Sequence, residues 1–283
     1  MVDTLVTAEQ LVGHLDDPQW VVFDCRFELA DPQAGERAWR EGHIPGARFA
    51  DLERDLSGPT GPRTGRHPLP DPDLLAGKLA GWGVGPQSQI VAYDDRGGAF
   101  AARLWWLARW LGHSHAAVLD GGLNRWRAEG RPLDQRTPHP VANTFKPQVD
   151  HDLWLRTDEV EEMMREQVGC LIDARDADRY AGKNEPVDPV AGHIPGAINL
   201  PFKDNLDSEG RFRSPDELAE RFHAALGGTD PAEVVHSCGS GVTACHNLLA
   251  MEVAGLRGSR LYAGSFSEWI RDPGRAVETG GGR

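Results

Sequence analysis

A short glycine-rich segment around Cys238 carries the residues most able to do chemistry. Residues 236–245 have the sequence HSCGSGVTAC, which follows an apolar stretch and precedes a helical pattern. A cysteine between a strand and a helix start is surrounded by backbone N–H groups that favour a thiolate or a bound anion. Gly239 and Gly241 let the backbone curl around the sulfur because they have no Cβ. We therefore predict that Cys238 is a nucleophile; the alternative is a buried, inert thiol.

The residues of the same segment do not match three other kinds of active site. A phosphatase-type loop needs an arginine at the position of Ala244. A serine-hydrolase elbow centred on Ser240 needs glycines where Cys238 and Val242 stand. A dithiol site would be CxxC, whereas the next cysteine, Cys245, is expected to be packed inside the following helix.

The chain contains an internal repeat. The sequence GHIPGA occurs at residues 42–47 and again at 192–197, and an Asp-x-Arg pair precedes it in each half, at 24–26 and 173–175. Proline-rich residues between the halves suggest a linker. We predict a first domain over 1–135, a linker over 136–150 and a second domain over 151–283.

The repeat also separates scaffold from function. Features present in both halves, the GHIPG histidines and the Asp-x-Arg pairs, are interpreted as structural. The cysteine loop is present only in the second half, because the first half has Asp94 or Asp95 at the corresponding position. The first domain is therefore predicted to be non-catalytic.

Short apolar runs alternate with helical patterns in both halves. The expected strands are 20–23, 89–93 and 116–119 in the first half, and 170–172, 233–236 and 260–262 in the second. Helix N-caps are expected at Thr7, Thr157 and Ser214. This alternation predicts an α/β fold with one parallel sheet flanked by helices in each half, with ligands beyond the carboxyl ends of the strands.

Composition excludes several partners. The 283 residues include 30 Lys and Arg against 43 Asp and Glu, which gives a net charge of −13 and argues against nucleic acids and anionic membranes. No apolar run approaches the ~18 residues of a membrane span, and residues 1–10 do not resemble a secretory signal. Four scattered cysteines suggest free thiols rather than disulfides or zinc. We expect a cytoplasmic protein without metal or cofactor.

These features resemble the tandem-domain rhodanese family of sulfurtransferases. The resemblance rests on the two GHIPGA segments and on the CGSGVT loop at 238–243, and it covers nearly the whole chain. That loop is similar to the loop of 3-mercaptopyruvate sulfurtransferases, whereas thiosulfate sulfurtransferases usually have basic residues after the cysteine. The resemblance implies two rhodanese-like domains and transfer of sulfur from 3-mercaptopyruvate through a persulfide on Cys238.

The resemblance also implies roles for other residues. Arg179 corresponds to an arginine that binds the carboxylate of the donor, and Ser240, His67 and Glu53 correspond to a serine, histidine and acid relay. Residues around the persulfide are Gly239, Gly241, Val242 and Thr243. A second donor-binding arginine of the animal enzymes has no counterpart between residues 182 and 192, where Lys183 is the available cation.

The implied partners are small molecules. The donor would be 3-mercaptopyruvate, and the acceptor cyanide, a small thiol or thioredoxin, with no nucleic acid or membrane involved. One alternative is a thiosulfate sulfurtransferase with the same nucleophile. Another is a persulfide carrier that delivers sulfur to a protein partner with little turnover of small donors.

Overall fold

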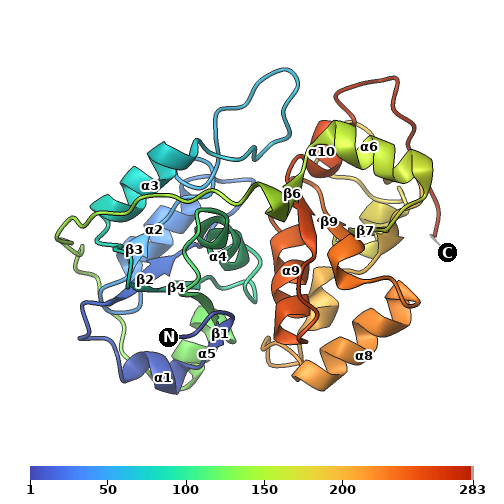
Figure 1. Ribbon diagram of the computed structural model, residues 1–283. Coiled ribbons are helices and arrows are strands. Elements are labelled where there is room, and N and C mark those ends of the chain that lie inside the picture. The colour runs from blue at the N-terminus through green and yellow to red at the C-terminus, as the bar shows by residue number, and fades with distance from the viewer. Residues whose placement is uncertain (282–283) are drawn as a thin grey trace. The chain divides into compact units, whose positions relative to one another are not determined.

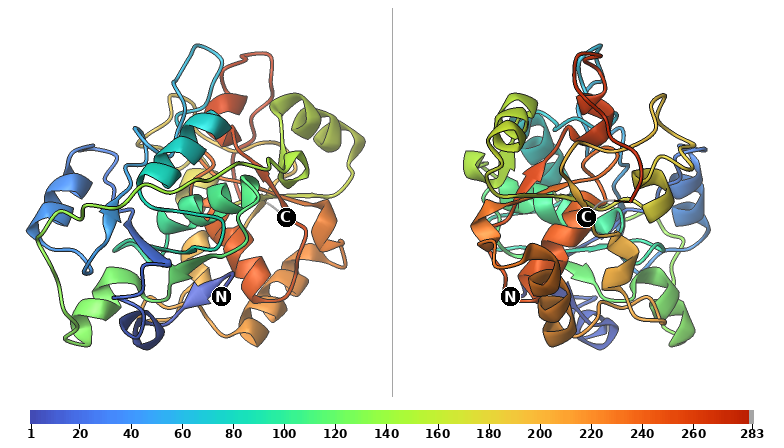
Figure 2. Two further views of the ribbon diagram at one scale, coloured as in Figure 1. Left: turned by 60° about the vertical axis from the view of Figure 1, so that its left-hand side comes forward. Right: turned by 90° about the vertical axis from the view of Figure 1, so that its right-hand side faces the viewer.

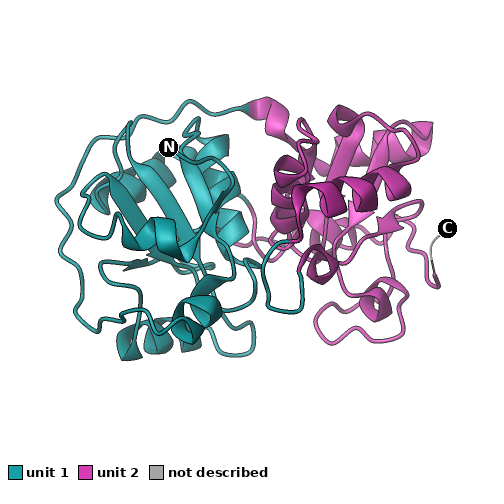
Figure 3. Ribbon diagram, turned by 90° about the horizontal axis from the view of Figure 1, so that it is seen from below, with its two compact units in different colours: residues 1–58, 69–150, 207–212 teal, residues 59–68, 151–206, 213–283 magenta. Residues whose placement is uncertain are grey.

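The computed structural model describes residues 1–281, which form two compact units. Unit 1 comprises residues 1–58, 69–150 and 207–212, and unit 2 comprises residues 59–68, 151–206 and 213–283 (Figure 3). The segment 59–68 therefore interrupts unit 1 along the sequence and is grouped with unit 2. Residues 136–150, expected to be a linker, are grouped with unit 1.

Unit 1 is an α/β unit built on a parallel sheet with strand order β1-β5-β4-β2-β3 (Figure 1). Its elements are β1 (Leu5–Val6), α1 (Ala8–Val12), β2 (Trp20–Asp24), α2 (Ala34–Glu41), β3 (Arg48–Phe49), α3 (Pro72–Gly81), β4 (Gln89–Tyr93), α4 (Ala101–Trp110), β5 (Ala116–Leu119) and α5 (Gly122–Ala128). The central strands are apolar on both faces because helices flank the sheet (Figure 2).

Unit 2 repeats this topology with strand order β6-β10-β9-β7-β8, again all parallel. Its elements are η1 (His151–Leu153), β6 (Trp154–Leu155), α6 (Thr157–Glu166), β7 (Cys170–Asp173), α7 (Ala177–Tyr180), β8 (Ile198–Asn199), η2 (Phe202–Asn205), α8 (Pro215–Leu226), η3 (Pro231–Glu233), β9 (Val234–Ser237), α9 (Ala244–Val253), β10 (Arg260–Tyr262) and α10 (Ser265–Trp269). The predicted α/β fold with one flanked parallel sheet per half is confirmed.

Both cores are formed by the same layers. In unit 1 the strand residues Val22 and Val91 pack with Trp126 of α5. In unit 2 the corresponding layer contains Val235 of β9 and Trp269 of α10. Burial of such side chains contributes about 1.5–3 kcal/mol each, which fixes the strand ends that carry the loops described below.

Two of the three predicted N-caps are confirmed. Thr7 and Ser214 each accept from the backbone N–H three residues later and form capping boxes. The expectation for Thr157 is wrong by one residue, because Arg156 is the N-cap and its N–H donates to Glu159 Oε2 at 2.7 Å. The Thr157 hydroxyl is instead bonded to Glu268 Oε1, 2.5 Å away. The hydroxyl thus bonds to a partly buried carboxylate of α10 and not to its own helix backbone.

Candidate active site around Cys238

Cys238 lies directly after β9, and the loop 238–243 leads into α9. The residue is 2% exposed. Its backbone N–H donates to Ser265 Oγ at 3.0 Å, and its carbonyl accepts from the N–H of Phe266 at 3.0 Å. The start of α10 therefore holds the cysteine on both sides of its peptide unit.

The two glycines of the loop are required for different reasons. Gly241 has a φ of +75°, and a Cβ on it would lie 2.3 Å from the carbonyl oxygen of Ala263. Gly239 has an ordinary φ, but its Cβ would lie 2.7 Å from Nη2 of Arg66. Gly241 therefore sets the path of the loop, and Gly239 leaves room for a guanidinium directly above it.

Val242 and Thr243 complete the loop. Val242 is buried, and Thr243 is the N-cap of α9 without a side-chain cap bond. Their carbonyls accept the N–H groups of Cys245 and His246 at 3.1 and 3.2 Å, so the helix is already forming at these residues. Cys245 is fully buried, as predicted.

Ser240 and His67 meet in unit 2. Ser240 Oγ and His67 Nδ1 are hydrogen-bonded at 2.8 Å, and the two residues are 7% and 4% exposed. A buried serine paired with an imidazole can hold or move a proton. The structure thus brings together two of the four residues predicted for catalysis, and Ser240 lies two residues after Cys238 in the loop.

Backbone contacts to α10 hold the segment that carries His67. The N–H of Gly65 donates to Glu268 Oε2 at 3.2 Å, and the N–H of Arg66 donates to Ser267 Oγ at 3.1 Å. The carbonyl of Thr64 accepts from Arg271 Nε at 3.0 Å. A Cβ on Gly65 would lie 2.7 Å from the carbonyl of Gly264, so this backbone approach requires glycine.

Arg179 is held by two carboxylates. Its Nε and Nη2 donate to Glu185 at 3.1 and 2.8 Å, and Nη2 also donates to Asp188 Oδ2 at 3.2 Å. Burial acts to raise the pKa of Glu185, but hydrogen bonds from Arg179 and from backbone N–H groups bring it below its usual value. Burial raises the pKa of Asp188 despite the neighbouring arginines Arg66 and Arg179.

The Asp-x-Arg pairs are structural, as predicted. Arg26 Nη2 and Arg175 Nη2 each lie 2.6 Å from the aspartate two residues earlier, and both pairs are buried. Each guanidinium also donates to the carbonyl of the glycine that opens GHIPG, at 2.9 and 2.8 Å. The pair ties the end of a central strand to the GHIPG turn.

The two remaining predicted residues lie differently. Glu53 belongs to unit 1, is exposed, and donates its backbone N–H to Asp51 Oδ1 at 2.9 Å. Lys183 is exposed in unit 2, and its backbone N–H donates to the carbonyl of Asp178 at 2.9 Å. Their functional roles stay predictions.

The counterpart loop of unit 1 contains a carboxylate. Asp24 pairs with Tyr93 and Asp173 pairs with Ser237, so Asp94 is the residue equivalent to Cys238. This register removes the ambiguity between Asp94 and Asp95. Asp94 accepts four backbone N–H groups at 2.8–2.9 Å, from residues 96, 98, 100 and 101. Its loop therefore holds a fixed internal anion and has no nucleophile at that position.

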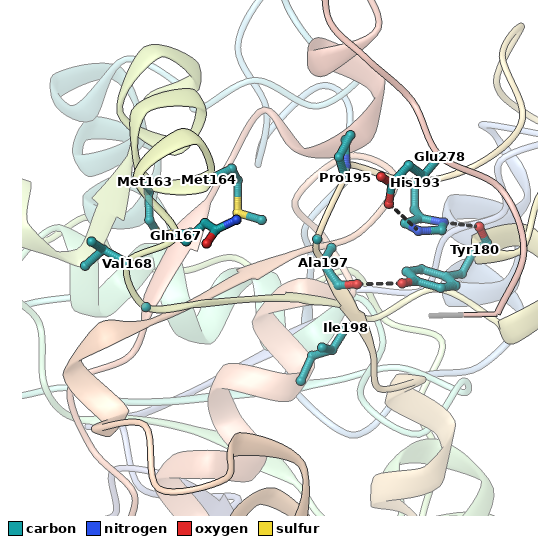
Figure 4. Close-up of a pocket in the computed structure, with 12 residues that line it drawn as sticks. Met163, Met164, Gln167, Val168, Tyr180, His193, Pro195, Ala197, Ile198 and Glu278 are labelled. Atoms are coloured by element: carbon teal, nitrogen blue, oxygen red, sulfur yellow. Dashed lines mark hydrogen bonds and ion pairs between the residues drawn. The ribbon is translucent and has the colours of Figure 1, made fainter. Parts of the chain in front are cut away.

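A cavity of about 660 Å³ in unit 2 lies at the GHIPG turn (Figure 4). Its lining includes Met164 of α6, Tyr180 of α7, His193 and Glu278. His193 Nδ1 is bonded to the carbonyl of Tyr180 at 2.8 Å, and the two rings stack with centroids 3.7 Å apart. His43 makes the same backbone bond in unit 1, to Trp39 at 2.7 Å. Both GHIPG histidines thus bond through Nδ1 to a backbone carbonyl of their own unit, which agrees with the structural interpretation.

Residues 1–281 lack three kinds of feature: a cluster of metal-ligating side chains, a membrane-spanning helix and a disulfide. Within that range no three His, Cys, Asp or Glu side chains form a group able to hold a metal ion. Over the same residues no helix is both long and apolar enough to cross a bilayer. The four cysteines are unpaired, as expected.

Three residues of this site were not predicted. Ser265 is the counterpart of Gly122, since both precede the tryptophan of their half, Trp269 and Trp126, by the same number of residues. The contrast of serine against glycine was a usable signal. Arg66 and Asp188 are 122 residues apart, and their contact has no local signal.

Comparisons with known proteins agree with this geometry. The rhodanese-like domain family matches residues 7–129 and again 156–272. A probable 3-mercaptopyruvate sulfurtransferase of Pseudomonas aeruginosa is 52% identical over 98% of both chains. A putative thiosulfate sulfurtransferase, SseB, of Mycobacterium tuberculosis is 37% identical over 98% of this chain and 97% of its own.

Solved structures are similar as well. The 3-mercaptopyruvate sulfurtransferase from Leishmania major has a TM-score of 0.83 and 30% identity, with 96% of this chain and 76% of that chain covered. SseA from Escherichia coli has a TM-score of 0.81 and 31% identity, with 93% and 98% covered. The chain therefore belongs to the rhodanese family, with two rhodanese-like domains in tandem.

Proposed function

We propose that this chain is a sulfurtransferase that moves a sulfur atom from 3-mercaptopyruvate through a persulfide on Cys238 to a thiophilic acceptor. The observation that carries the proposal is the loop 238–243 of unit 2, where Cys238 is held by α10, Ser240 is bonded to His67, and Arg179 lies over Gly239. The 52% identity with the Pseudomonas relative supports the choice of donor.

The first half-reaction makes the persulfide. The Cys238 thiolate attacks the sulfur of 3-mercaptopyruvate, an S–S bond forms, and the C–S bond breaks with its electron pair on carbon. The resulting pyruvate enolate takes the proton of the former thiol, so that pyruvate leaves and the anionic persulfide remains. Backbone N–H groups of a strand-to-helix loop stabilise such an anion.

The second half-reaction regenerates the thiolate. Cyanide or a thiolate attacks the outer sulfur, the S–S bond breaks, and its electron pair returns to Cys238. Thiocyanate or a new persulfide leaves. Cyanide, a small thiol and thioredoxin are the acceptors we propose, and the mechanism needs no metal or cofactor.

Other residues act on the donor and its protons. The bond between Ser240 and His67 gives the site a proton relay for the enolate. Arg179 provides a planar pair of donors for the carboxylate. We also propose Glu53 as the acid of the relay, Lys183 as a further positive charge for the donor, and the backbone of 239–243 as the surroundings of the persulfide.

A thiosulfate sulfurtransferase is the second candidate, favoured by the relative from Mycobacterium tuberculosis. Thiosulfate is a dianion, so a site specific for it needs uncompensated positive charge. Here two guanidiniums, those of Arg66 and Arg179, lie near Gly239. Glu185 and Asp188 contact them and balance their charge. Gly239 and Ser240 add none. The charge balance therefore favours a monocarboxylate donor.

The deciding experiment measures initial rates of sulfur transfer to cyanide with each donor. We expect 3-mercaptopyruvate to exceed thiosulfate by about an order of magnitude in kcat/KM, and Cys238→Ser to be inactive. Cys170→Ser is the matched control because Cys170 is a half-buried cysteine of the same unit. A preference for thiosulfate would refute the choice of donor. Inactivity with both donors would favour a persulfide carrier instead.

The compartment is also part of the proposal. All four cysteines are unpaired, a state that a reducing cytoplasm maintains and that the persulfide cycle needs.

The predicted domains at 1–135 and 151–283, with a linker between them, belong to the proposal too. Cell fractionation tests the cytoplasmic compartment, and limited proteolysis within 136–150 tests the linker.

A further inference from the structure

A segment from the first half of the sequence carries the relay histidine into unit 2. Residues 59–68 lie between β3 and α3 in the sequence, and they are grouped with unit 2 (Figure 3). His67, near the end of this segment, is bonded to Ser240 at 2.8 Å. The structure describes all ten residues of the segment and places them outside every helix and strand. The position of His67 therefore depends on the contacts that the segment makes with its surroundings.

Ser267 of α10 joins this segment to the cysteine loop. Its backbone N–H donates to the carbonyl of Gly239 at 2.9 Å, and its Oγ accepts from the N–H of Arg66 at 3.1 Å. These two contacts are with the residue after Cys238 and with the residue before His67. Ser267 is 2% exposed. One buried residue therefore fixes the backbone of the nucleophile relative to the backbone of the relay histidine.

Glu268, the next residue of α10, holds the segment one position earlier. Its Oε2 accepts from the N–H of Gly65 at 3.2 Å, and its Oε1 accepts from the Thr157 hydroxyl at 2.5 Å. The Tyr262 hydroxyl lies 2.9 Å from that of Thr157. Burial raises the pKa of Tyr262, so the phenol keeps its proton and can donate to Thr157. The two hydroxyls thus form a chain of donors that holds the carboxylate through Oε1 and leaves Oε2 for the segment.

The backbone and the carboxylate pack closely at this point. A Cβ on Gly264 would lie 2.5 Å from Cδ of Glu268, so the glycine leaves room for the carboxylate to fold back over it. A Cβ on Gly65 would lie 2.9 Å from Ser267 Oγ. The segment therefore lies directly against α10, where hydrogen bonds sheltered from water hold it in one position.

Unit 1 offers a comparison, because the segment 207–212 of the second half is grouped with it. That segment lies between β8 and α8, as 59–68 lies between β3 and α3. Arg125 of α5 is the counterpart of Glu268, since each directly precedes the tryptophan of its half. Arg125 Nη1 pairs with Glu209 Oε2 at 2.6 Å, and these side chains are 33% and 56% exposed. At this position unit 1 uses an ion pair open to solvent, whereas unit 2 uses a bond to a backbone N–H near the relay histidine.

We propose that Ser267 and Glu268 are positioning residues of the proton relay, which dock the segment 59–68 so that the His67 ring meets Ser240 in the Cys238 loop. Neither positioning residue needs to touch the donor. This inference rests on the proposed function, in which the relay passes the proton of the donor's thiol to the pyruvate enolate. The effect of both residues is therefore confined to the half-reaction that makes the persulfide.

The kinetic test measures pyruvate formation from 3-mercaptopyruvate with cyanide as acceptor. In Glu268→Ala and Ser267→Ala we expect kcat to fall roughly tenfold with KM nearly unchanged, because a displaced histidine loses part of its acid–base effect. Glu268→Gln should keep most of the activity, since its amide oxygen can still accept from Gly65. Arg125→Ala is the matched control in unit 1 and should behave as wild type. A higher KM with unchanged kcat in the two alanine variants would overturn the proposal.

A double-mutant cycle shows whether Glu268 acts through the relay. In a Ser240→Ala background the relay is already broken, so adding Glu268→Ala should lower kcat by less than about twofold. The same tenfold loss in both backgrounds would refute the proposal, because the carboxylate would then act independently of the relay.

The second half-reaction provides a further control. Enzyme loaded with a persulfide from inorganic polysulfide transfers its outer sulfur to cyanide without forming an enolate. The rate of that transfer should stay within about twofold of wild type in Glu268→Ala and Ser267→Ala. A tenfold loss in this step would show general damage to the cysteine loop and would also refute the proposal.

Hydrogen exchange measured by NMR gives a readout that does not depend on turnover. The amide protons of Gly65 and Arg66 are hydrogen-bonded in the wild type and should exchange slowly. Glu268→Ala should speed exchange at Gly65 by roughly tenfold or more, whereas Glu268→Gln and Arg125→Ala should not. An unchanged rate in Glu268→Ala would refute the docking role even if activity fell.

These outcomes separate the two proposals. If wild type transfers no sulfur from 3-mercaptopyruvate, the proposed function fails, and exchange at Gly65 still tests the docking of the segment. If Cys238→Ser is inactive and both alanine variants keep the wild-type kcat, the proposed function stands and the positioning role is wrong. Equal circular dichroism and melting temperature exclude misfolding as the cause. Should Glu268→Ala fail to fold, Ser267→Ala carries the same tests, with exchange followed at Arg66.

Discussion

Ser265 has a backbone conformation that glycine would adopt more easily. Its φ is +51°, and its counterpart in unit 1, Gly122, has a φ of +55°. The hydroxyl of Ser265 accepts from the N–H of Cys238 at 3.0 Å and donates to the carbonyl of Tyr262 at 2.9 Å, which a glycine could not do. Backbone strain and hydrogen bonding therefore oppose each other at one residue beside the nucleophile.

Two substitutions separate the effect of backbone strain from the effect of the two hydrogen bonds. Ser265→Ala keeps the strain and removes both hydrogen bonds, leaving the buried N–H of Cys238 without its acceptor, so we expect a loss of about 2–3 kcal/mol in the free energy of unfolding. Ser265→Gly loses the same bonds but relieves the left-handed strain, and should be about 1 kcal/mol more stable than the alanine variant. Both should transfer sulfur more slowly than wild type, because Cys238 loses a fixed contact.

Urea denaturation followed by tryptophan fluorescence measures these differences from the midpoints at equal slope. Gly122→Ala is the matched control in unit 1, where the same backbone demand exists beside a loop that has an aspartate in place of the cysteine. It should be destabilised, because its Cβ would also lie 2.4 Å from the carbonyl oxygen of Asp94. If Ser265→Ala were as stable as Ser265→Gly, the argument from backbone strain would be refuted.

Three further predictions concern ionisable groups. Asp94→Ala should lower the free energy of unfolding by about 3 kcal/mol, measured in urea, since four backbone N–H groups lose their acceptor; a loss below about 1 kcal/mol would contradict it. Burial lowers the pKa of His236 to about 3, so between pH 6.5 and 3 the unfolded chain binds one more proton and stability falls as pH falls. His236→Leu should reduce that slope by about 1 kcal/mol per pH unit, and an unchanged slope would speak against a neutral buried imidazole. Burial raises the pKa of Cys170 to about 11, so iodoacetamide at pH 8 should label Cys238 before Cys170. Mass spectrometry that finds Cys170 labelled first would contradict this prediction.

The fold was predictable because its central strands are long apolar runs. Residues 89–93 and 116–119 were expected as strands and form β4 and β5 with the same bounds. The edge strands β1, β3, β6 and β8 have two residues each, too few to show a period in sequence. Their positions follow from pairing with the central strands.

The site was predictable only where the repeat or the resemblance supplied a contrast. Cys238 stood out against the first half, and the pairing of Ser240 with His67 was expected from the resemblance and is present in the structure. The contact between Arg66 and Asp188 depends on where the segment 59–68 docks, and this is decided by backbone contacts with α10. No local pattern encodes such a docking.

The two loops show how one backbone serves two purposes. In unit 1 the carboxylate of Asp94 permanently occupies the N–H groups of its own loop, which stabilises the turn and leaves nothing to react. In unit 2 the equivalent side chain is the thiol of Cys238, which becomes an anion only as thiolate or persulfide. Persulfide transfer needs an anion that forms and departs within one cycle, so a loop already neutralised by a fixed aspartate is unsuitable. Replacing Asp94 by cysteine would therefore not be enough to create a second site, because Gly122 in unit 1 has no hydroxyl to replace that of Ser265, which holds the Cys238 N–H in unit 2.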